Sequence, residues 1–537
     1  MKRIFLSIAV ALLAATVVFG QEIKQADVDE QLKNLPFASF SIKLPSFPDK
    51  TFNIVDAGAV GDGQFKNTVA INSTIEKCSK AGGGKVVIPA GLWLTGPITM
   101  QSNVNLYLAE GAIVIFSPDL NDYQLERTSS GKYQLPDLIN GEGLENVAIT
   151  GRGMFNGNGQ YWRMVKKEKK TEKEWKALIK SGELTADGKI WYPRKGSLAS
   201  EELIKANKAS YTPEEEATIK ISLRPYMLAL RKCKNVLIEG ITLGNAPKFA
   251  AYMNGHREVV FHDVKVRNEW WMQNADGLDI SVCKNVLFYR CDVNTGDDGI
   301  CMKSGNSKNG EFNHENIVVK DCKVYHGHGG FVIGSNTDGN MRNIFVDNCS
   351  FVGTHSGIRV KSGAGRGGKV TDIFCQNIYM KDIEGDAIVY ELAYEDKGAV
   401  VNTDNKAEKI PDFDGFSIKN VFIDGAKVGV NIGGNAQSIV KNVTFQNMVI
   451  HAKEGFKTVL SENITVDNVR IISDVQPAFR LNKVNGFTFK NQKDVPEGFY
   501  IKVLGEQSKN ISIENSAIKA SQVELLDNLK PDILKIK

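Results

Sequence analysis

The sequence predicts an all-β chain wound into a parallel β-helix, and three observations indicate this fold. A pattern of Asn-apolar-x-apolar begins at Asn235, Asn285 and Asn316, and it returns at intervals that cluster between 21 and 31 residues. Each copy alternates with a period of two and is rich in Val, Ile and Phe, as strands prefer. Asn, Asp and Gly separate the copies, as turns require. Regular repeats of this length indicate a solenoid whose parallel strands stack about 4.8 Å apart.

The repeat covers most of the chain. Further copies begin at Asn343, Asn420, Asn442, Asn463 and Asn510, and weaker ones lie near Asn146, Glu258, Asp372 and Gly486. The interval of 48 residues between Asp372 and Asn420 would fit two turns of the helix. We expect the recurring Asn to form a ladder at one turn. Leucine-rich and helical repeats are excluded because the copies have no helical periodicity.

The first segment of the chain, residues 1–20, has the features of a secretory signal. Lys2 and Arg3 precede an apolar run from Ile4 to Phe19, and Gly20 offers a small residue for cleavage. We expect export to the periplasm or the extracellular space, with no membrane insertion after cleavage. A retained anchor is the alternative, although a membrane span needs roughly 20 apolar residues. Residues 21–50 form an N-terminal extension.

The β-helix is expected to occupy residues 51–520. A short amphipathic helix, with Asn67 as its N-cap and Lys80 before its glycine-rich end, would cover the N-terminal opening. A polar, Lys- and Glu-rich insertion of helical character occupies about 160–223, and insertions in repeat proteins often lie on the binding face. Residues 521–537 form a C-terminal tail that we expect to cover the other end.

Charge and cysteine content narrow the function classes. Residues 163–195 hold eleven Lys or Arg and five Asp or Glu, which indicates either a solvated helical face or a basic rim for a polyanion. Aromatic residues and Arg do not alternate there, so a nucleic-acid partner is not expected.

Cys291, Cys322 and Cys349 recur at one phase of the repeat, which favours a stack of buried thiols over disulfides. No zinc-ligand spacing is present in the sequence.

Four short motifs carry the candidate chemistry. Asp276, Asp297 and His328 lie 21 and 31 residues apart, and Arg359 follows after another 31. Coils of this length would stack the motifs, so Asp298 and Lys361 would join the same patch. Crowded carboxylates raise the pKa of one member, and glycoside hydrolysis needs such an acid beside a base. Cations beside them suit an anionic sugar.

Strand geometry limits this patch. Adjacent residues in a strand point to opposite faces, so Asp297 and Asp298 can both contribute only if a bend lies at the flanking Gly296 or Gly299. We expect Asp279 and Asp292 to be turn or ladder residues outside the chemistry.

The motifs resemble those of glycoside hydrolase family 28, the polygalacturonases. The resemblance is carried by the runs Asn274-Ala-Asp-Gly-Leu-Asp-Ile280, Thr295-Gly-Asp-Asp-Gly-Ile-Cys-Met-Lys-Ser-Gly305, Gly327-His-Gly-Gly-Phe-Val-Ile-Gly-Ser335, Gly357-Ile-Arg-Val-Lys-Ser362 and Ala57-Gly-Ala-Val-Gly-Asp-Gly63. It implies a right-handed, single-stranded parallel β-helix of the pectin lyase-like type. It also implies inverting hydrolysis of α-linkages in pectin without a metal or another cofactor.

The resemblance also implies residue roles. Asp297 would be the general acid, while Asp276 and Asp298 would hold and activate water. His328 would support the acid. Arg359 and Lys361 would bind the galacturonate carboxylate, and Arg366 in a glycine-rich turn is a further candidate contact. The sequence departs from the family pattern at Ala275, usually Thr, and at Asn336, where exo-acting members often carry Glu.

We therefore expect a monomeric, exported hydrolase that cleaves α-1,4-galacturonosyl bonds in pectic polysaccharides or oligogalacturonides. The insertion beside the groove favours exo action. Endo-polygalacturonase and rhamnogalacturonan hydrolase activities are alternatives within the class. A calcium-dependent polysaccharide lyase and a non-catalytic carbohydrate-binding β-helix are alternatives from other classes.

Overall fold

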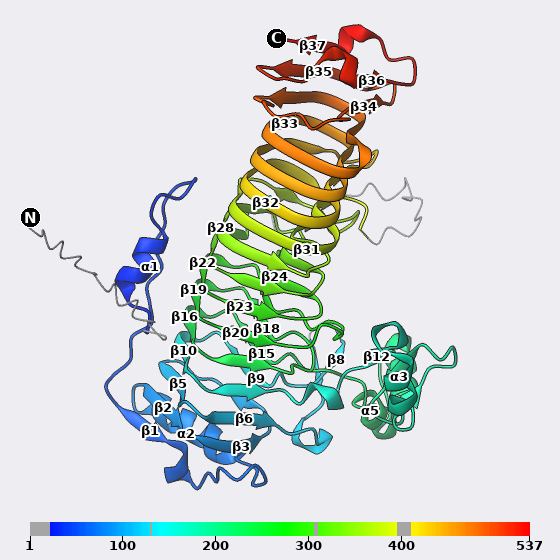
Figure 1. Cartoon of the computed structure of the whole chain (residues 1–537). Coiled ribbons are helices and arrows are strands. Elements are labelled where there is room, and N and C mark those ends of the chain that lie inside the picture. Colours follow the sequence, from blue (N-terminus) through cyan, green and yellow to red (C-terminus); the bar gives the residue numbers. More distant parts are fainter. Residues whose placement is uncertain (1–21, 129–130, 306–309, 395–409) are drawn as a thin grey trace, which may run out of the picture.

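The computed structural model describes residues 22–128, 131–305, 310–394 and 410–537. The expected signal segment, 1–20, lies outside these ranges. The chain forms a long right-handed parallel β-helix, with the N-terminal coils at one end and the C-terminal coils at the other (Figure 1). The predicted fold class is confirmed.

Parallel strands stack in three rows along this helix. Row 1 contains β1 (Thr51–Asn53), β2 (Gly84–Ile88), β5 (Val104–Leu108), β10 (Glu145–Gly151), β16 (Lys234–Glu239), β19 (Arg257–His262), β22 (Lys284–Tyr289), β25 (His314–Lys320), β35 (Lys509–Glu514) and β37 (Leu534–Ile536). Row 2 contains β3 (Gly91–Thr95), β6 (Ala112–Phe116), β11 (Met154–Asn156), β17 (Thr242–Gly244), β20 (Lys265–Arg267), β23 (Asp292–Asn294) and β26 (Lys323–Tyr325).

Row 3 carries the candidate residues. It contains β4 (Ile98–Thr99), β9 (Ile139–Glu142), β15 (Leu228–Arg231), β18 (Ala251–Asn254), β21 (Leu278–Ser281), β24 (Asp298–Lys303), β27 (Gly329–Ile333), β29 (Ile358–Lys361), β34 (Ile501–Leu504) and β36 (Val523–Leu525). In the C-terminal half, long bent strands pass from one row to the next: β28 (Met341–Val352), β31 (Ile373–Glu391), β32 (Asp412–Gly433) and β33 (Val440–Lys490), with the short β30 (Lys369–Val370) beside them.

The expected asparagine ladder is present. The first residues of the repeat have positive φ, including the weaker copies at Glu258, Asp372 and Gly486. Asn316 Nδ2 donates to Asn285 Oδ1 at 2.9 Å, and Asn343 donates in turn to Asn316 at 3.0 Å. Asn tolerates the left-handed conformation better than most residues, and its side chain pairs along the stack. This explains why the sequence repeats Asn at the corner.

Two details of the predicted repeat are wrong. Asn420 belongs to a second corner, because its side chain donates to Asn377 at 3.0 Å. Ile373 pairs directly with Phe416, 43 residues later, so this stretch is one long coil and not two turns. The periodic pattern could not separate two corners of one coil, since both use Asn.

The interior of the coils is apolar. Successive inward positions stack, as in Phe261 over Phe288 with ring centroids 4.7 Å apart. All eight cysteines fall within the described residues, and each is a buried free thiol. Cys291, Cys322 and Cys349 occupy equivalent positions in row 2, as the repeat predicted. These small thiols pack in the apolar core there.

Short helices and turns complete the β-helix. The helices are α1 (Gln25–Gln31), α2 (Thr68–Lys80), α3 (Glu172–Leu178), α4 (Ser197–Ala206) and α5 (Pro213–Ile219), with 3₁₀ turns η1 (Ile54–Ala57), η2 (Leu120–Asp122), η3 (Gly159–Tyr161), η4 (Lys167–Lys169), η5 (Ala520–Gln522) and η6 (Pro531–Ile533). Helix α2 packs at the N-terminal opening, as expected. Asn67 occupies its N-cap position, but its Oδ1 accepts from Val60 N at 2.7 Å instead of capping the helix.

The C-terminal tail extends the β-helix further than expected. Strands β36 and β37 pair in parallel with β34 and β35, so the rows continue to Ile536, past the expected boundary at 520. The tail therefore adds a coil to the stack and is not a separate cover.

The N-terminal extension lies along the outer face of row 1. Residues 22–47, which we name the N-terminal strap, bury Ile23, Val28 and Leu32 against outward-facing apolar residues of successive coils, including Leu237 and Val260. Its start is held where Ile23 N donates to Glu239 Oε1 at 2.6 Å.

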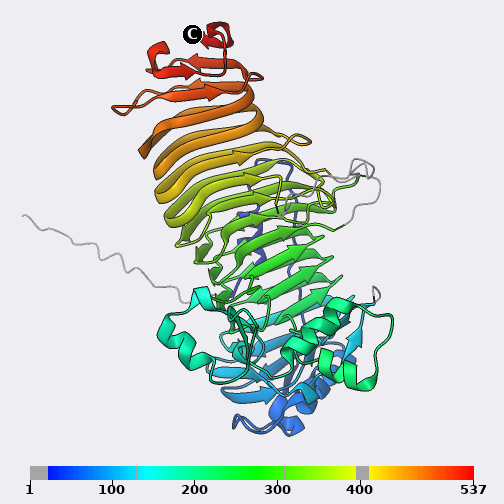
Figure 2. The same ribbon diagram turned by 90° about the vertical axis from the view of Figure 1, so that its right-hand side faces the viewer.

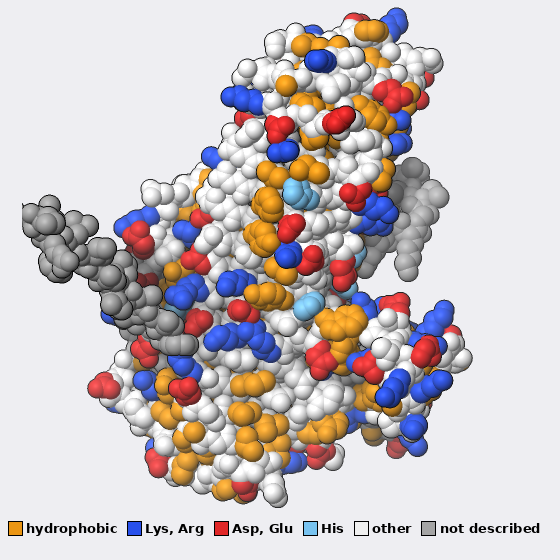
Figure 3. Space-filling view, in the orientation of Figure 1, with side chains coloured by type: hydrophobic (Ala, Val, Ile, Leu, Met, Phe, Trp, Pro, Cys, Tyr) orange, Lys and Arg blue, Asp and Glu red, His pale blue; other side chains and the backbone are white. Residues whose placement is uncertain are grey.

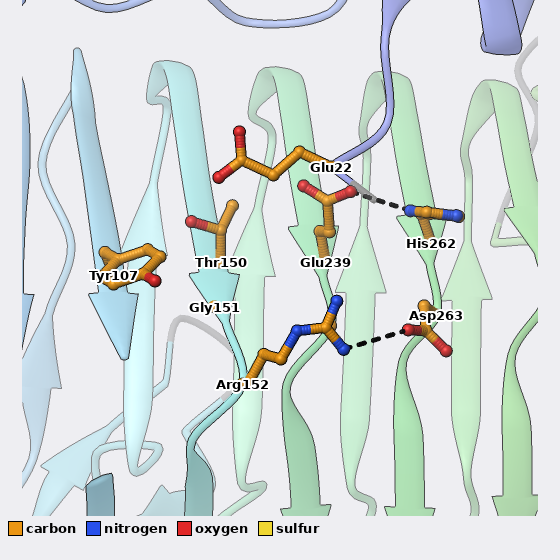
Figure 4. Close-up of a pocket in the computed structure, with 9 residues that line it drawn as sticks. Glu22, Tyr107, Thr150, Gly151, Arg152, Glu239, His262 and Asp263 are labelled. Atoms are coloured by element: carbon orange, nitrogen blue, oxygen red, sulfur yellow. Dashed lines mark hydrogen bonds and ion pairs between the residues drawn. The ribbon is translucent and has the colours of Figure 1, made fainter. Parts of the chain in front are cut away.

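A small hollow of about 120 Å³ adjoins the start of the strap. There Glu239 contacts His262, and Arg152 lies opposite Asp263 (Figure 4). This hollow lies on row 1, away from the motifs of row 3.

The insertion projects from the N-terminal coils and lies at the lower end of the face that Figure 2 presents. Besides α3, α4 and α5 it contains a small antiparallel sheet of β12 (Val165–Lys166), β13 (Glu183–Leu184) and β14 (Ile190–Tyr192). A nearby hairpin pairs β7 (Glu126–Arg127) with β8 (Tyr133–Gln134). Among the described residues, no helix is long and apolar enough to cross a bilayer.

Candidate active site

The coil register brings the four motifs together on row 3. Gly277 N donates to Asp298 O at 2.8 Å, which aligns Asp276 with Asp298 on the next coil. Asp298 then pairs with Gly329, which directly follows His328. The chain bends at Gly296 and Asp297 before β24 begins. A Cβ on Gly296 would lie 2.4 Å from the carbonyl oxygen of Met272, so this tight bend requires glycine.

Asp297 lies at the centre of a compact group. His328 Nδ1 lies 3.1 Å from Asp297 Oδ1, and Asn274 N donates to Asp297 Oδ2 at 3.1 Å. One oxygen each of Asp297 and Asp298 and one ring nitrogen of His328 lie within 4.8 Å of one another. The expected bend is therefore present, and it lets Asp297 and Asp298 face the same point although they are neighbours in the sequence.

Asp298 is buried against a cation. Lys361 Nζ donates to Asp298 Oδ2 at 2.8 Å, and both side chains are almost inaccessible to solvent. Burial alone would raise the pKa of Asp298, but Lys361, followed by Lys303 and Arg359, outweighs it and lowers the pKa to about 2. Asp298 is therefore a carboxylate at neutral pH. Its other oxygen, Oδ1, is buried without a hydrogen-bond partner among the described residues.

Asp276 is in the opposite electrostatic state. Burial raises its pKa well above the ordinary value, and the nearby Asp279 and Asp297 raise it further. The ammonium of Lys303 lies 3.5 Å from Asp276 Oδ2 and only partly offsets these effects. The site thus holds one carboxyl group that retains its proton easily and one that does not.

Two residues of this group were not assigned to the site from the sequence. Asp279 is fully buried in β21 and contacts Lys303 Nζ, so the expectation that it is a turn or ladder residue is wrong. Burial raises its pKa to about 6 despite Lys303. Asp292, in contrast, lies on row 2 and pairs with Arg267 at 2.6 Å. The alternation of β21 and β24 would have placed Asp279 and Lys303 on the outer face, but nothing in the pattern showed that this face is buried.

The three expected substrate cations converge on one ring. Lys361 Nζ, Arg359 Cζ and Arg366 Cζ lie 5.0, 5.4 and 6.0 Å from the centroid of Tyr394. Arg366 also donates to Ser335 Oγ at 2.9 Å. Tyr394 follows β31, one coil beyond Lys361, and no sequence motif pointed to it. A hollow of about 390 Å³ opens beside Arg359 and continues toward the C-terminal coils.

Comparisons with known proteins identify the family of the chain. The sequence profile of the family described as Glycosyl hydrolases family 28 matches residues 201–469, half of the chain. The chain belongs to glycoside hydrolase family 28. It is a polygalacturonase-type hydrolase whose family acts on pectic galacturonan.

Named relatives include both modes of attack. The chain is 25% identical to the exo-poly-alpha-D-galacturonosidase of Dickeya chrysanthemi, with 74% of this chain and 67% of that protein covered. It is also 25% identical to an endo-polygalacturonase of Pectobacterium carotovorum subsp. carotovorum, with 73% and 87% covered. At this identity the comparison does not separate exo from endo action in this family 28 hydrolase.

A solved structure shares the fold. The hyperthermoactive exopolygalacturonase from Thermotoga maritima matches with a TM-score of 0.67 and 26% identity, covering 84% of this chain and 97% of that one. The match shows that this polygalacturonase-type hydrolase shares its β-helix fold with that enzyme.

Proposed function

We propose that this family 28 member is an exported hydrolase that releases units from the ends of α-1,4-linked galacturonan chains with inversion at the anomeric carbon. The proposal is carried by one observation: Asp276 and Asp298, whose pKa values are shifted in opposite directions, share a patch of row 3 with Asp297 and with cations suited to a uronate. Export is inferred from the signal-like residues 1–20.

The proposed chemistry assigns each aspartate one task. Asp297, in contact with His328, protonates the leaving oxygen as the general acid. Asp298 is ionised, and its unpartnered Oδ1 can accept a proton from the attacking water. Asp276 holds the same water from the adjacent coil. Arg359 and Lys361 are assigned to the sugar carboxylate, because a guanidinium can hold a carboxylate through two hydrogen bonds and the ammonium adds positive charge beside it.

The spacing of the carboxyl groups makes the stereochemistry a sharp test. Inverting glycosidases usually separate acid and base by roughly 6.5–9.5 Å, which leaves room for water. The nearest oxygens of Asp297 and Asp298 lie within 4.8 Å. The proposed inversion therefore depends on Asp276 and Asp298 holding the attacking water together. NMR of the first product should show the inverted anomer, and the retained anomer would overturn this mechanism.

The position of the insertion supports attack at chain ends. It lies at the N-terminal end of the face that carries row 3 (Figure 2). Arg224, where the insertion rejoins the β-helix, donates to Gln273 O at 3.2 Å and to Asn274 Oδ1 at 2.9 Å, beside Asp276. An insertion fixed in this position would block the N-terminal end of the site, so a polymer chain could not extend past it.

Product analysis tests this mode of attack. A time course on polygalacturonate should show mono- or digalacturonate from the first minutes while the polymer keeps its viscosity. Early release of many oligomer sizes would identify an endo enzyme instead.

A further inference from the structure

A short loop links the aspartates to the insertion. Residues 269–274 precede Asp276, and their last amide, Asn274 N, donates to Asp297. On the other side Arg163, which is buried in the insertion, contacts Met272 Sδ and donates to Ala246 O at 2.8 Å. The loop is therefore held at Met272 and at Asn274, and the residues at its tip, directly before Met272, have a defined position.

The two tryptophans at the tip have different environments. Trp271 packs against Val165, Trp175 and Trp191 in the small core of the insertion. Trp270 is 51% exposed, which is unusual for so large an apolar side chain. Hydrophobic side chains gather where the insertion meets the β-helix (Figure 3). Trp271 thus anchors the loop, and Trp270 is presented to solvent.

Two lysines of the insertion lie over these rings. Lys169 Nζ lies 5.4 Å from the centroid of Trp270, and Lys170 Nζ lies 3.9 Å from that of Trp271. No carboxylate of the described residues forms an ion pair with either lysine. They belong to the basic segment 163–195, in which positive charge exceeds negative.

We propose that Trp270 and Lys169 form a subsite for one galacturonate unit at the insertion end of row 3. The apolar face of the sugar ring would lie on Trp270, and its carboxylate would pair with Lys169. An exposed indole offers a rigid apolar surface at low entropic cost, and the ammonium beside it selects a uronate over a neutral sugar. This subsite rests on the proposed function, because its ligand is a unit of the galacturonan chain.

The test measures binding separately from turnover. An Asp297→Asn variant of the full chain should bind oligogalacturonate without cleaving it. In that background Trp270→Ala and Lys169→Ala should each weaken binding about three- to tenfold, as loss of roughly 1 kcal/mol implies. Titration of the Asp297→Asn protein should also change its tryptophan fluorescence, and Trp270→Ala should reduce that change.

Matched controls come from exposed residues elsewhere. Lys180→Ala removes one charge from the same insertion without a ring partner among the described residues, and Phe422→Ala removes an exposed ring from row 2. Both should bind as the parent does. All four positions are exposed or partly exposed, so unchanged melting temperatures are expected.

The outcomes separate the two proposals. If Trp270→Ala and Lys169→Ala bind like their controls while the wild type cleaves polygalacturonate, the subsite is refuted and the proposed function stands. If neither wild type nor Asp297→Asn acts on or binds galacturonan, the proposed function fails and the subsite with it. If Lys169→Ala weakens binding of a neutral oligosaccharide as much as it weakens binding of oligogalacturonate, the proposed pairing of Lys169 with the carboxylate is refuted.

Discussion

Lys361 Nζ lies 2.8 Å from Asp298 Oδ2, and 6% and 4% of the two side chains are exposed. The two residues are 63 positions apart in sequence but only two coils apart along the helix. This contact makes Asp298 a carboxylate while its neighbour Asp276 retains its proton more readily. The contact with Lys361 therefore gives Asp298 a lower pKa than Asp276, although the two side chains are chemically identical.

Removing the ammonium of Lys361 should destabilise the fold, because the buried carboxylate of Asp298 would lose its partner. Lys361→Met leaves Asp298 without its first partner, so we expect a loss of about 3–5 kcal/mol in the free energy of unfolding at pH 7. Because the pKa of Asp298 is lowered in the folded state, the contribution of the pair is present above pH 4 or so and is lost as pH falls toward 2.

The destabilisation by Lys361→Met should accordingly shrink between pH 7 and pH 3 in urea titrations. The double variant Asp298→Asn/Lys361→Met should recover part of the stability. An effect independent of pH would show that Lys361 acts through packing and not through the charge of Asp298.

Asp297→Asn should abolish most turnover. Loss of a general acid typically lowers the rate by a factor of about 10²–10⁴. We expect kcat to fall within this range while the dissociation constant for oligogalacturonate stays within about threefold, a change below 1 kcal/mol. The matched control is Asp292→Asn, because Asp292 pairs with Arg267 on row 2 outside the patch. Undiminished turnover in Asp297→Asn would refute its assignment as the acid.

Lys303→Met should shift the pH profile of activity. Lys303 lowers the pKa of both Asp276 and Asp279, although burial keeps both above their ordinary values. Without the ammonium both pKa values rise, so the acidic limb of kcat/KM should move to higher pH. Lys303→Arg retains the charge and should move it less. A profile that keeps its shape and only falls in height would point to a structural role.

Chelation should leave the activity unchanged. The proposed hydrolysis uses side chains of this chain for acid, base and substrate binding. Activity on polygalacturonate in EDTA should therefore equal that in calcium, with no gain in ultraviolet absorbance. Loss of activity in EDTA with an absorbing product would indicate the lyase alternative.

The asparagine ladder should contribute measurably to stability. Asn316 has φ of 61° and bonds to the coils before and after it. Asn316→Ala loses these bonds and also strains a left-handed backbone, which costs roughly 1–2 kcal/mol in a non-glycine residue. Asn316→Gly loses only the bonds. The alanine variant should therefore unfold at lower urea concentration than the glycine variant, and the reverse order would contradict the role of φ.

The sequence was sufficient for the coil architecture and for grouping the four motifs in one patch, but not for adding Asp279, Lys303 or Tyr394 to it. A strand period of two within a repeat of 21 to 31 residues admits few folds, and the spacing of Asp276, Asp297, His328 and Arg359 follows that repeat. The errors arose where one signal had two meanings. Asn marks both corners of a coil, so Asn420 was placed at the wrong one, and an interval of 48 residues resembled two turns although Ile373 pairs directly with Phe416.

Tertiary structure alone decided the electrostatic identity of the site. Which aspartate is ionised depends on which oxygen Lys361 and Lys303 reach, and these contacts join residues on different coils. The sequence alternation shows which side chains face outward from the coils, but it does not show what packs over them. Contacts between distant segments therefore decided the burial of Asp279, the convergence of three cations on Tyr394 and the packing of the N-terminal strap on row 1. A pattern in one dimension determines which face a side chain occupies, whereas its pKa depends on everything that packs around it in three.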